Sequence, residues 1–139
     1  MSETYMLDTD ICSYVIRERP PRLKRVFLEH LQDAVLISVV TYAELLYGLE
    51  KKPSEKLERD ISGFVSLVKI ADWNYAAAQR YAKIRHHLTS SGKVMSDIDM
   101  QIAAAAEAMN AKLVTNNKKH FGMIPELALA DWLLTPDNK

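Results

Sequence analysis

The sequence predicts an α/β fold in which helices cover both faces of a parallel sheet. Short apolar runs alternate along the chain with segments of helical periodicity. The apolar runs lack a polar residue at every second position, which is typical of strands buried on both faces. The chain has 139 residues, of which 48% are hydrophobic, and this is enough for one domain with its own core. We therefore expect a single domain over residues 1–139.

The first half of the chain predicts two short strands and four helices. In chain order they are a strand at 5–7, a helix at 9–17, a helix after Pro20-Pro21, a strand at 35–37, a helix at 40–50 and a helix spanning 57–68. Proline is favoured in the first turn of a helix, and this places the start of the second helix. Ser54 is a candidate N-cap after a polar turn, so the helices on either side of it form a hairpin.

The second half of the chain predicts three strands and three helices. In chain order they are a strand at 68–71, a helix at 74–88 that ends near Gly92, an alanine-rich helix at 97–109, a strand at 112–114, a turn with a short helix at 115–120 and an edge strand at 127–129. Sites on parallel sheets form at the carboxyl ends of strands. Asp8 and the run Thr115-Asn116-Asn117 each follow a predicted strand, so we expect a site there.

Three carboxylates occupy informative positions, although each also has a purely structural explanation. Asp8 follows the first strand and is a suitable N-cap for the next helix. Asp99 is the third residue after Ser96, in a sequence that resembles a capping box. Glu44 lies among apolar residues that leave its helix almost no solvated face. A carboxylate there needs a buried arginine, a position at the rim of the helix, or a metal.

Together, the three acids predict a metal site. They lie at the ends or starts of elements around one sheet and can converge on one cleft, where they repel each other unless a divalent cation is present. Oxygen ligands without a nearby His or Cys cluster favour Mg²⁺, with Mn²⁺ as a substitute, over Zn²⁺. A metal held in this way suits the hydrolysis of a phosphodiester by an activated water.

The composition limits the partners and the compartment. Lys plus Arg and Asp plus Glu both total 18, so the formal net charge is zero and any nucleic-acid surface must come from local clustering of basic residues. Cys12 is the single cysteine, which excludes an internal disulfide and indicates a reducing compartment. The N-terminus does not resemble a signal peptide, and no stretch is long and apolar enough to span a bilayer. We expect a cytoplasmic protein that does not act at a membrane.

Four motifs occur in a characteristic order and together span residues 5–121. They are YMLDTDIC, SVVTYAELLYGLE, SDIDMQIAAAAEA and LVTNNKKHF. In this order they closely resemble the PIN-domain toxins of the VapC type. The resemblance implies a three-layer α/β/α fold with a short, mostly parallel sheet and an Mg²⁺-dependent endoribonuclease activity. It also implies a homodimer, a cognate antitoxin bound near the hairpin at 40–68, and an RNA substrate, often a tRNA cut at the anticodon loop, initiator tRNA included.

The resemblance assigns roles to individual residues. Asp8 matches the first acid of the family, Glu44 the acid of the AEL motif and Asp99 the acid before the alanine run. Asp97 is commonly acidic in the family and is expected near the metal. Asn117 stands where many members carry a fourth acid. Its neutral amide cannot supply that charge, although it can orient a water or a phosphate, so one Mg²⁺ is expected rather than two.

Several polar residues near the same sheet edge are candidates for supporting roles. The hydroxyls of Thr9 and Thr115 are placed to hydrogen-bond a carboxylate or a metal-bound water, or simply to cap a helix. Lys118, Lys119 and His120 follow the strand at 112–114 and are candidate contacts for RNA phosphates. His120 is also a candidate for acid–base chemistry.

Two alternative functions fit part of the pattern. The run Asp8-Thr9-Asp10 resembles the DxD motif of haloacid-dehalogenase-like phosphatases, in which Asp8 would be a covalent nucleophile. That chemistry needs a suitably placed lysine and a larger domain, and it has no use for Glu44. The second alternative is a non-catalytic RNA- or protein-binding module that has kept the fold, but the intact acids at 8, 44 and 99 argue against it.

Overall fold

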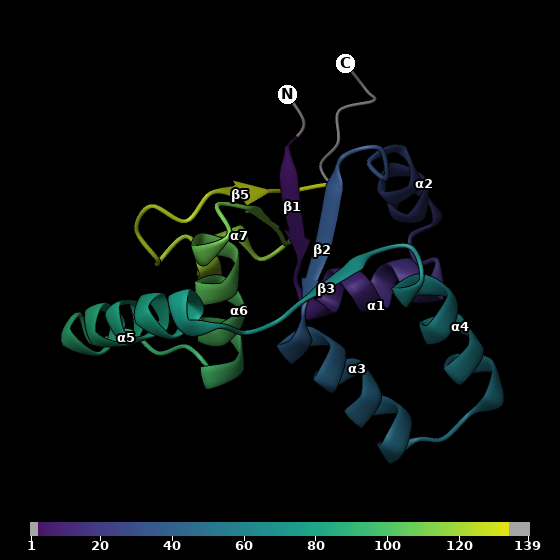
Figure 1. Ribbon diagram of the computed structural model, residues 1–139, viewed down its shortest axis with the longest axis horizontal. Coiled ribbons are helices and arrows are strands. Elements are labelled where there is room, and N and C mark those ends of the chain that lie inside the picture. Colours follow the sequence, from purple (N-terminus) through teal and green to yellow (C-terminus); the bar gives the residue numbers. More distant parts are fainter. Residues whose placement is uncertain (1–2, 134–139) are drawn as a thin grey trace.

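Five parallel strands form one sheet in the computed structural model, which describes residues 3–133 (Figure 1). The strands are β1 (Thr4–Leu7), β2 (Ala34–Ser38), β3 (Lys69–Ala71), β4 (Lys112–Val114) and β5 (Leu129–Ala130). Their order across the sheet is β3-β2-β1-β4-β5, and every neighbouring pair is parallel. Tyr5 of β1 pairs with Val35 on one side and Lys112 on the other. The strand order therefore reverses at β1, and such a switch point opens a crevice at the carboxyl end of the sheet.

Seven helices lie within residues 3–133. They are α1 (Thr9–Arg17), α2 (Pro21–Glu29), α3 (Val39–Lys51), α4 (Glu55–Val65), α5 (Tyr75–Ser90), α6 (Asp97–Ala108) and α7 (Lys118–Phe121). Five of them begin at a residue whose side chain accepts a hydrogen bond from a first-turn N–H: Asp8, Ser38, Ser54, Asn74 and Ser96. None of these seven helices is long and apolar enough to cross a bilayer.

Strand side chains alternate between two apolar cores, one on each face of the sheet. On one face Met6 and Leu113 pack with residues of α5 and α6. On the other face Leu7 and Val114 pack with residues of α1, α2, α3 and α4. Figure 1 shows the sheet between these two groups of helices. The three-layer α/β/α architecture and the parallel sheet covered on both faces are therefore confirmed.

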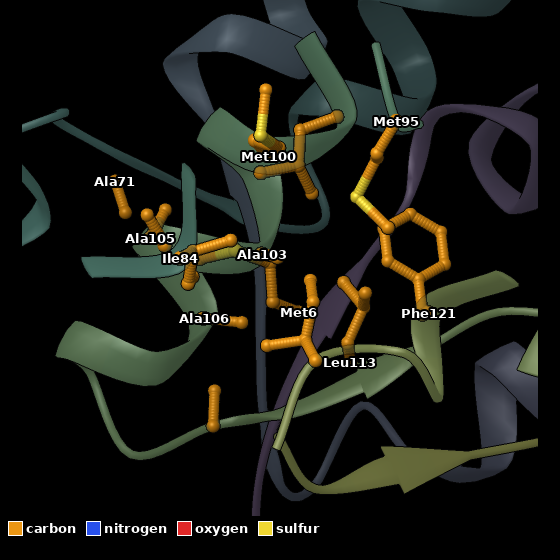
Figure 2. Close-up of a cluster of buried hydrophobic side chains, with 14 of the residues drawn as sticks. Met6, Ala71, Ile84, Met95, Met100, Ala103, Ala105, Ala106, Leu113 and Phe121 are labelled. Carbon is orange, nitrogen blue, oxygen red and sulfur yellow. The ribbon is translucent and has the colours of Figure 1, made fainter. Parts of the chain in front are cut away.

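The alanine-rich helix α6 is the most deeply buried helix of its layer. Ala103 to Ala106 are each no more than 2% exposed. Figure 2 shows these small side chains close to Ile84 of α5 and to Met6 and Leu113 of the sheet. The chain leaves α6 to enter the start of β4, so α6 runs back toward the amino end of the sheet. Its own N-terminus, which carries Asp99, consequently lies toward the carboxyl end, where the site is expected.

Element boundaries differ from the sequence expectations at a few places. The helix expected to run to residue 68 ends at Val65, because the chain must turn before Lys69 pairs with Leu36 of β2. The strand expected at 68–71 is accordingly Lys69–Ala71. The last strand is Leu129–Ala130 rather than 127–129, because its register is set by pairing with β4. These shifts follow from long-range strand pairing, which local periodicity does not report.

Candidate active site

Asp8 is the buried acid of the site. It follows β1 directly, its residue is 5% exposed, and its Oδ1 accepts a hydrogen bond from the Ile11 N–H at 2.9 Å. Burial raises the pKa of Asp8 to about 6, and the negative charges of Asp10 and Asp99 act in the same direction. Hydrogen bonds from the Thr115 hydroxyl and from Ile11 oppose this shift. Asp8 is thus both the N-cap of α1 and a carboxylate held at the end of the central strand.

Helix α3 is less buried than its apolar sequence predicts. Only Thr41 and Leu45 are buried, whereas Leu46 and Tyr47 are 38% and 62% exposed. The helix starts at the carboxyl end of β2 and extends beyond the sheet, as Figure 1 shows, so solvent reaches most of its surface. The prediction that Glu44 has almost no solvated face is therefore wrong.

Glu44 is half-buried and faces the start of α1. Its Oε1 accepts a hydrogen bond from the Thr9 hydroxyl at 2.7 Å, and the Thr9 oxygen lies 3.3 Å from the hydroxyl of buried Thr41. The Thr9 hydroxyl therefore connects α1 to α3 across the mouth of the site. Of the alternatives considered for Thr9, the structure shows the hydrogen bond to a carboxylate.

Asp99 and Asp97 point in different directions from the first turn of α6. The Asp99 N–H donates to the Ser96 hydroxyl at 3.1 Å, and Asp99 Oδ2 lies 3.1 Å from Nε2 of His120. Asp97 instead accepts a hydrogen bond from the Tyr81 hydroxyl at 2.6 Å on α5. Asp97 therefore lies on the α5 side of the helix and is not part of the lining of the cleft that holds Asp8, Glu44 and Asp99.

The three acids line one cleft at the carboxyl end of β1. The cleft has a volume of about 310 Å³ and is lined by Asp8, Thr9, Asp10, Glu44, Asp99, Asn117 and Phe121. Sequence reasoning placed Asn117 here but treated Asp10 only as a helix-start residue. The signal for Asp10 was present, because a residue two positions after a strand-end acid lies in the first turn of the same helix.

The candidate RNA-binding residues lie outside this cleft. Lys118 Nζ is 3.6 Å from a carboxylate oxygen of Asp131, Lys119 is exposed, and His120 contacts Asp99. Thr115 bonds Asp8 and also accepts the Asn117 N–H at 2.9 Å, so it shapes the turn after β4. No lysine lines the cleft among residues 3–133, so the phosphatase alternative lacks the lysine that it requires.

The cleft suits a hard divalent cation. Its charged ligands are all carboxylates, with one amide beside them and no His or Cys in its lining, which favours Mg²⁺ or Mn²⁺ over Zn²⁺. Within the described residues, no three His, Cys, Asp or Glu side chains converge closely enough to ligate one ion together. Mg²⁺ does not need such a cage, because it keeps several waters and binds through one or two carboxylates. The residues therefore fit this ion.

A groove adjoins the acidic cleft and shares Thr9 and Glu44 with it. It lies between α1, α3 and α4 and has a volume of about 310 Å³. Its lining combines apolar with cationic side chains: Ile16, Leu45, Leu57, Ile61, Arg17, Lys51 and Lys52. An extended surface thus leads directly into the acidic site.

Comparison with known proteins gives consistent matches over nearly the whole chain. The family model described as PIN domain matches residues 5–126, which include every residue that lines the cleft. Ribonuclease VapC2 from Rickettsia felis is 37% identical over 130 residues, covering 92% of this chain and 97% of that relative. The tRNA(fMet)-specific endonuclease VapC from Shigella flexneri is 37% identical over 131 residues, with coverage of 92% and 97%.

A solved structure agrees with the fold. The structure of VapBC2 from Rickettsia felis, bound to a DNA fragment from their promoter, contains a chain that is similar with a TM-score of 0.88 and 35% identity. The alignment covers 93% of this chain and 98% of that one.

Proposed function

The chain belongs to the PIN-domain family, as a ribonuclease of the VapC type, and we propose that it is the Mg²⁺-dependent endoribonuclease toxin of a toxin–antitoxin pair. The observation that carries the proposal is the placement of Asp8, Glu44 and Asp99 around one cleft, from three separate elements. The names of the similar proteins, ribonuclease and endonuclease, support the same chemistry.

The residues of the cleft have different proposed roles in catalysis. Asp8 and Asp99 would hold the ion directly, and Glu44 would complete its surroundings. When bound, Mg²⁺ supplies Lewis-acid polarisation of a phosphoryl oxygen and makes water a better nucleophile. The negative cleft repels a phosphodiester unless a cation neutralises it, so the acids also make RNA binding depend on the metal. Asn117 lines the same cleft, and its amide would orient the phosphate or the attacking water.

Cleavage assays on purified protein test this proposal. We expect cleavage of RNA with Mg²⁺, loss of cleavage in EDTA, and recovery with Mg²⁺ or Mn²⁺. Asp99→Asn should lower the rate by roughly 100-fold or more, because one carboxylate of the ion site is lost. Asp97→Asn is the matched control two residues away and should cleave like the wild type, since Asp97 bonds Tyr81 outside the cleft. An Asp99→Asn variant that cleaves as fast as the wild type would contradict the site.

A tRNA is the proposed substrate, initiator tRNA in particular. The support is the relative from Shigella flexneri, whose name specifies tRNA(fMet) and which is 37% identical. Sequencing of RNA 5′ ends after brief expression should show new ends concentrated in the anticodon loop of one tRNA. Cleavage spread over messenger RNA, with tRNA intact, would agree with a nuclease activity but contradict tRNA as the substrate.

The groove between α1, α3 and α4 is the proposed docking site for the cognate antitoxin, and we infer that the active assembly is a homodimer. An antitoxin segment with apolar side chains fits the apolar part of the groove, and a basic residue at its end would neutralise the acids nearby. The solved VapBC structures, which contain toxin and antitoxin together, support a partner of this kind.

A further inference from the structure

Each of the three proposed metal-site acids, Asp8, Glu44 and Asp99, has a side-chain hydrogen-bond partner. The Thr115 hydroxyl bonds Asp8, and the Thr9 hydroxyl bonds Glu44. Asp99 differs because its donor is an imidazole, with His120 Nε2 at 3.1 Å from Oδ2. In the tautomer with the proton on Nε2, His120 donates this bond and the Asp99 carboxylate accepts it.

His120 contacts Asp99 without being part of the lining of the cleft. The cleft lining includes the neighbouring Phe121 but, among the described residues, not His120 itself. The side chains of His120 and Asp99 are 26% and 37% exposed. His120 is therefore placed to act through Asp99 rather than on a substrate.

The short helix α7 holds the imidazole in place. Phe121 is 2% exposed, its N–H donates to the Asn117 carbonyl at 3.1 Å, and its ring meets the His120 ring edge-on at 5.2 Å. Figure 2 shows the Met95 side chain pointing at the Phe121 ring from the segment before α6. The anchor of α7 therefore packs against the same segment that leads into the first turn of α6.

Asp99 has a competing position to which it would otherwise turn. It is the third residue of α6 after the N-cap Ser96, where an acidic side chain commonly folds back to the N-cap N–H in a capping box. The described residues show the Ser96 hydroxyl bonding Asp99 N–H but no return bond from the Asp99 carboxylate. The carboxylate is instead bonded to His120, which leaves Oδ1 for the cleft.

We propose that His120 is a positioning residue that keeps the Asp99 carboxylate turned toward the metal and out of the capping box. The inference rests on the proposed function, since it assumes that Asp99 binds the ion. It replaces a direct role of His120 in binding RNA phosphates with a role in orienting a ligand. Donors behind metal-binding carboxylates commonly change metal affinity by roughly 10- to 100-fold.

Calorimetric titration of the RNA-free protein with Mn²⁺ tests the proposal. His120→Phe keeps an aromatic ring beside Phe121 but removes the donor, and we expect Mn²⁺ binding roughly 10-fold weaker. His120→Gln keeps an N–H donor and should recover most of that loss. Both variants should melt close to the wild-type temperature, whereas a merely structural role would lower both melting temperatures and leave no rescue by Gln. Lys119→Gln, on the exposed neighbour, is the control and should bind Mn²⁺ like the wild type.

The outcomes separate this inference from the proposed function. If the wild type binds Mn²⁺, Asp99→Asn does not, and His120→Phe binds like the wild type, the positioning role is overturned and the nuclease proposal stands. If the wild type and Asp99→Asn bind Mn²⁺ equally, Asp99 is not a ligand and both proposals fail. If His120→Phe instead weakens only the binding of a labelled tRNA, His120 is a phosphate contact and the positioning role is overturned.

Discussion

In the metal-free protein, the position of the Asp8 carboxylate is energetically unfavourable. Its carboxylate is almost fully buried, and hydrogen bonds from the Ile11 N–H and the Thr115 hydroxyl partly compensate for the lost water. Nearby Asp10 and Asp99 add repulsion. A cation in the cleft would offset both the lost hydration of the Asp8 carboxylate and its repulsion by the neighbouring acids. The unfavourable environment of Asp8 therefore favours binding of a cation.

The raised pKa of Asp8 predicts a pH-dependent stability. Its pKa is about 6 in the folded protein and 3.8 in a free side chain, so the folded state holds the proton more tightly. Stability is therefore highest below about pH 4 for this group and falls as the pH rises through about 6. In EDTA, the free energy of unfolding of Asp8→Asn relative to that of the wild type should rise by up to about 3 kcal/mol between about pH 4 and pH 7. The reason is that only the wild type loses stability as Asp8 ionises. Urea unfolding measures the difference.

Asp10→Asn is the control for this measurement, because Asp10 is exposed. Its stability difference from the wild type should change much less over the same pH range. A flat difference for Asp8→Asn would mean that Asp8 is ionised at no cost, contrary to its burial.

At the scale of elements, helix starts aim the functional side chains. Ser96 caps α6 through the Asp99 N–H at 3.1 Å, and Ser54 caps α4 through the Leu57 N–H at the same distance. The two caps are chemically equivalent, but only the first adjoins the acidic cleft. They therefore allow stability and catalysis to be separated.

Removing these two caps should have equal effects on stability and unequal effects on activity. Ser96→Ala and Ser54→Ala should each lower the free energy of unfolding by about 1 kcal/mol. Ser96→Ala should also slow RNA cleavage several-fold, because the turn that carries Asp99 loosens, whereas Ser54→Ala should not. Chemical unfolding and cleavage rates on the same preparations check both statements. Equal activities in the two variants would show that the cap does not help to aim Asp99.

Local sequence patterns were good guides to elements and to the acids at their starts. Asp8 and Asp99 were each expected to have a capping role or a place in the site. The structure shows Asp8 as the N-cap of α1 and the Asp99 N–H bonded to the N-cap Ser96, and both acids line the cleft. Periodicity failed for Glu44, because it reports which residues are apolar and not how far a helix extends beyond the sheet. The contact between His120 and Asp99 could not be predicted from the sequence either, because it depends on how α7 packs beside α6.

At the scale of the whole molecule, the groove between α1, α3 and α4 makes the acidic cleft accessible to a protein partner. Gly48 lines this groove, and a Cβ added there would meet nothing within 4 Å. Gly63 on α4 is equally unobstructed but lines a different hollow, beside Phe27 and Leu67. Both glycines lie inside helices, so a larger residue should raise helix stability at either position.

These two glycines test the docking surface. Gly48→Leu should fill the groove and weaken binding of the cognate antitoxin, while RNA cleavage by the isolated nuclease stays near the wild-type rate. Gly63→Leu should bind the antitoxin normally. Co-expression followed by affinity purification measures how much antitoxin is retained by each variant. Full retention by Gly48→Leu would place the antitoxin elsewhere.

The acids that line one cleft are far apart along the chain, and this determines when during synthesis the enzyme can become active. Asp8 directly follows the first strand, whereas Asp99 and its partner His120 belong to α6 and α7. At about 5–20 residues per second, the ribosome needs several seconds to add the segment between Asp8 and Asp99. On the proposed assignment of Asp99 as a metal ligand, a nascent chain is inactive during that time because it lacks this carboxylate. Synthesis therefore gives the cell an interval in which an inhibitor can already be waiting when the nuclease first folds.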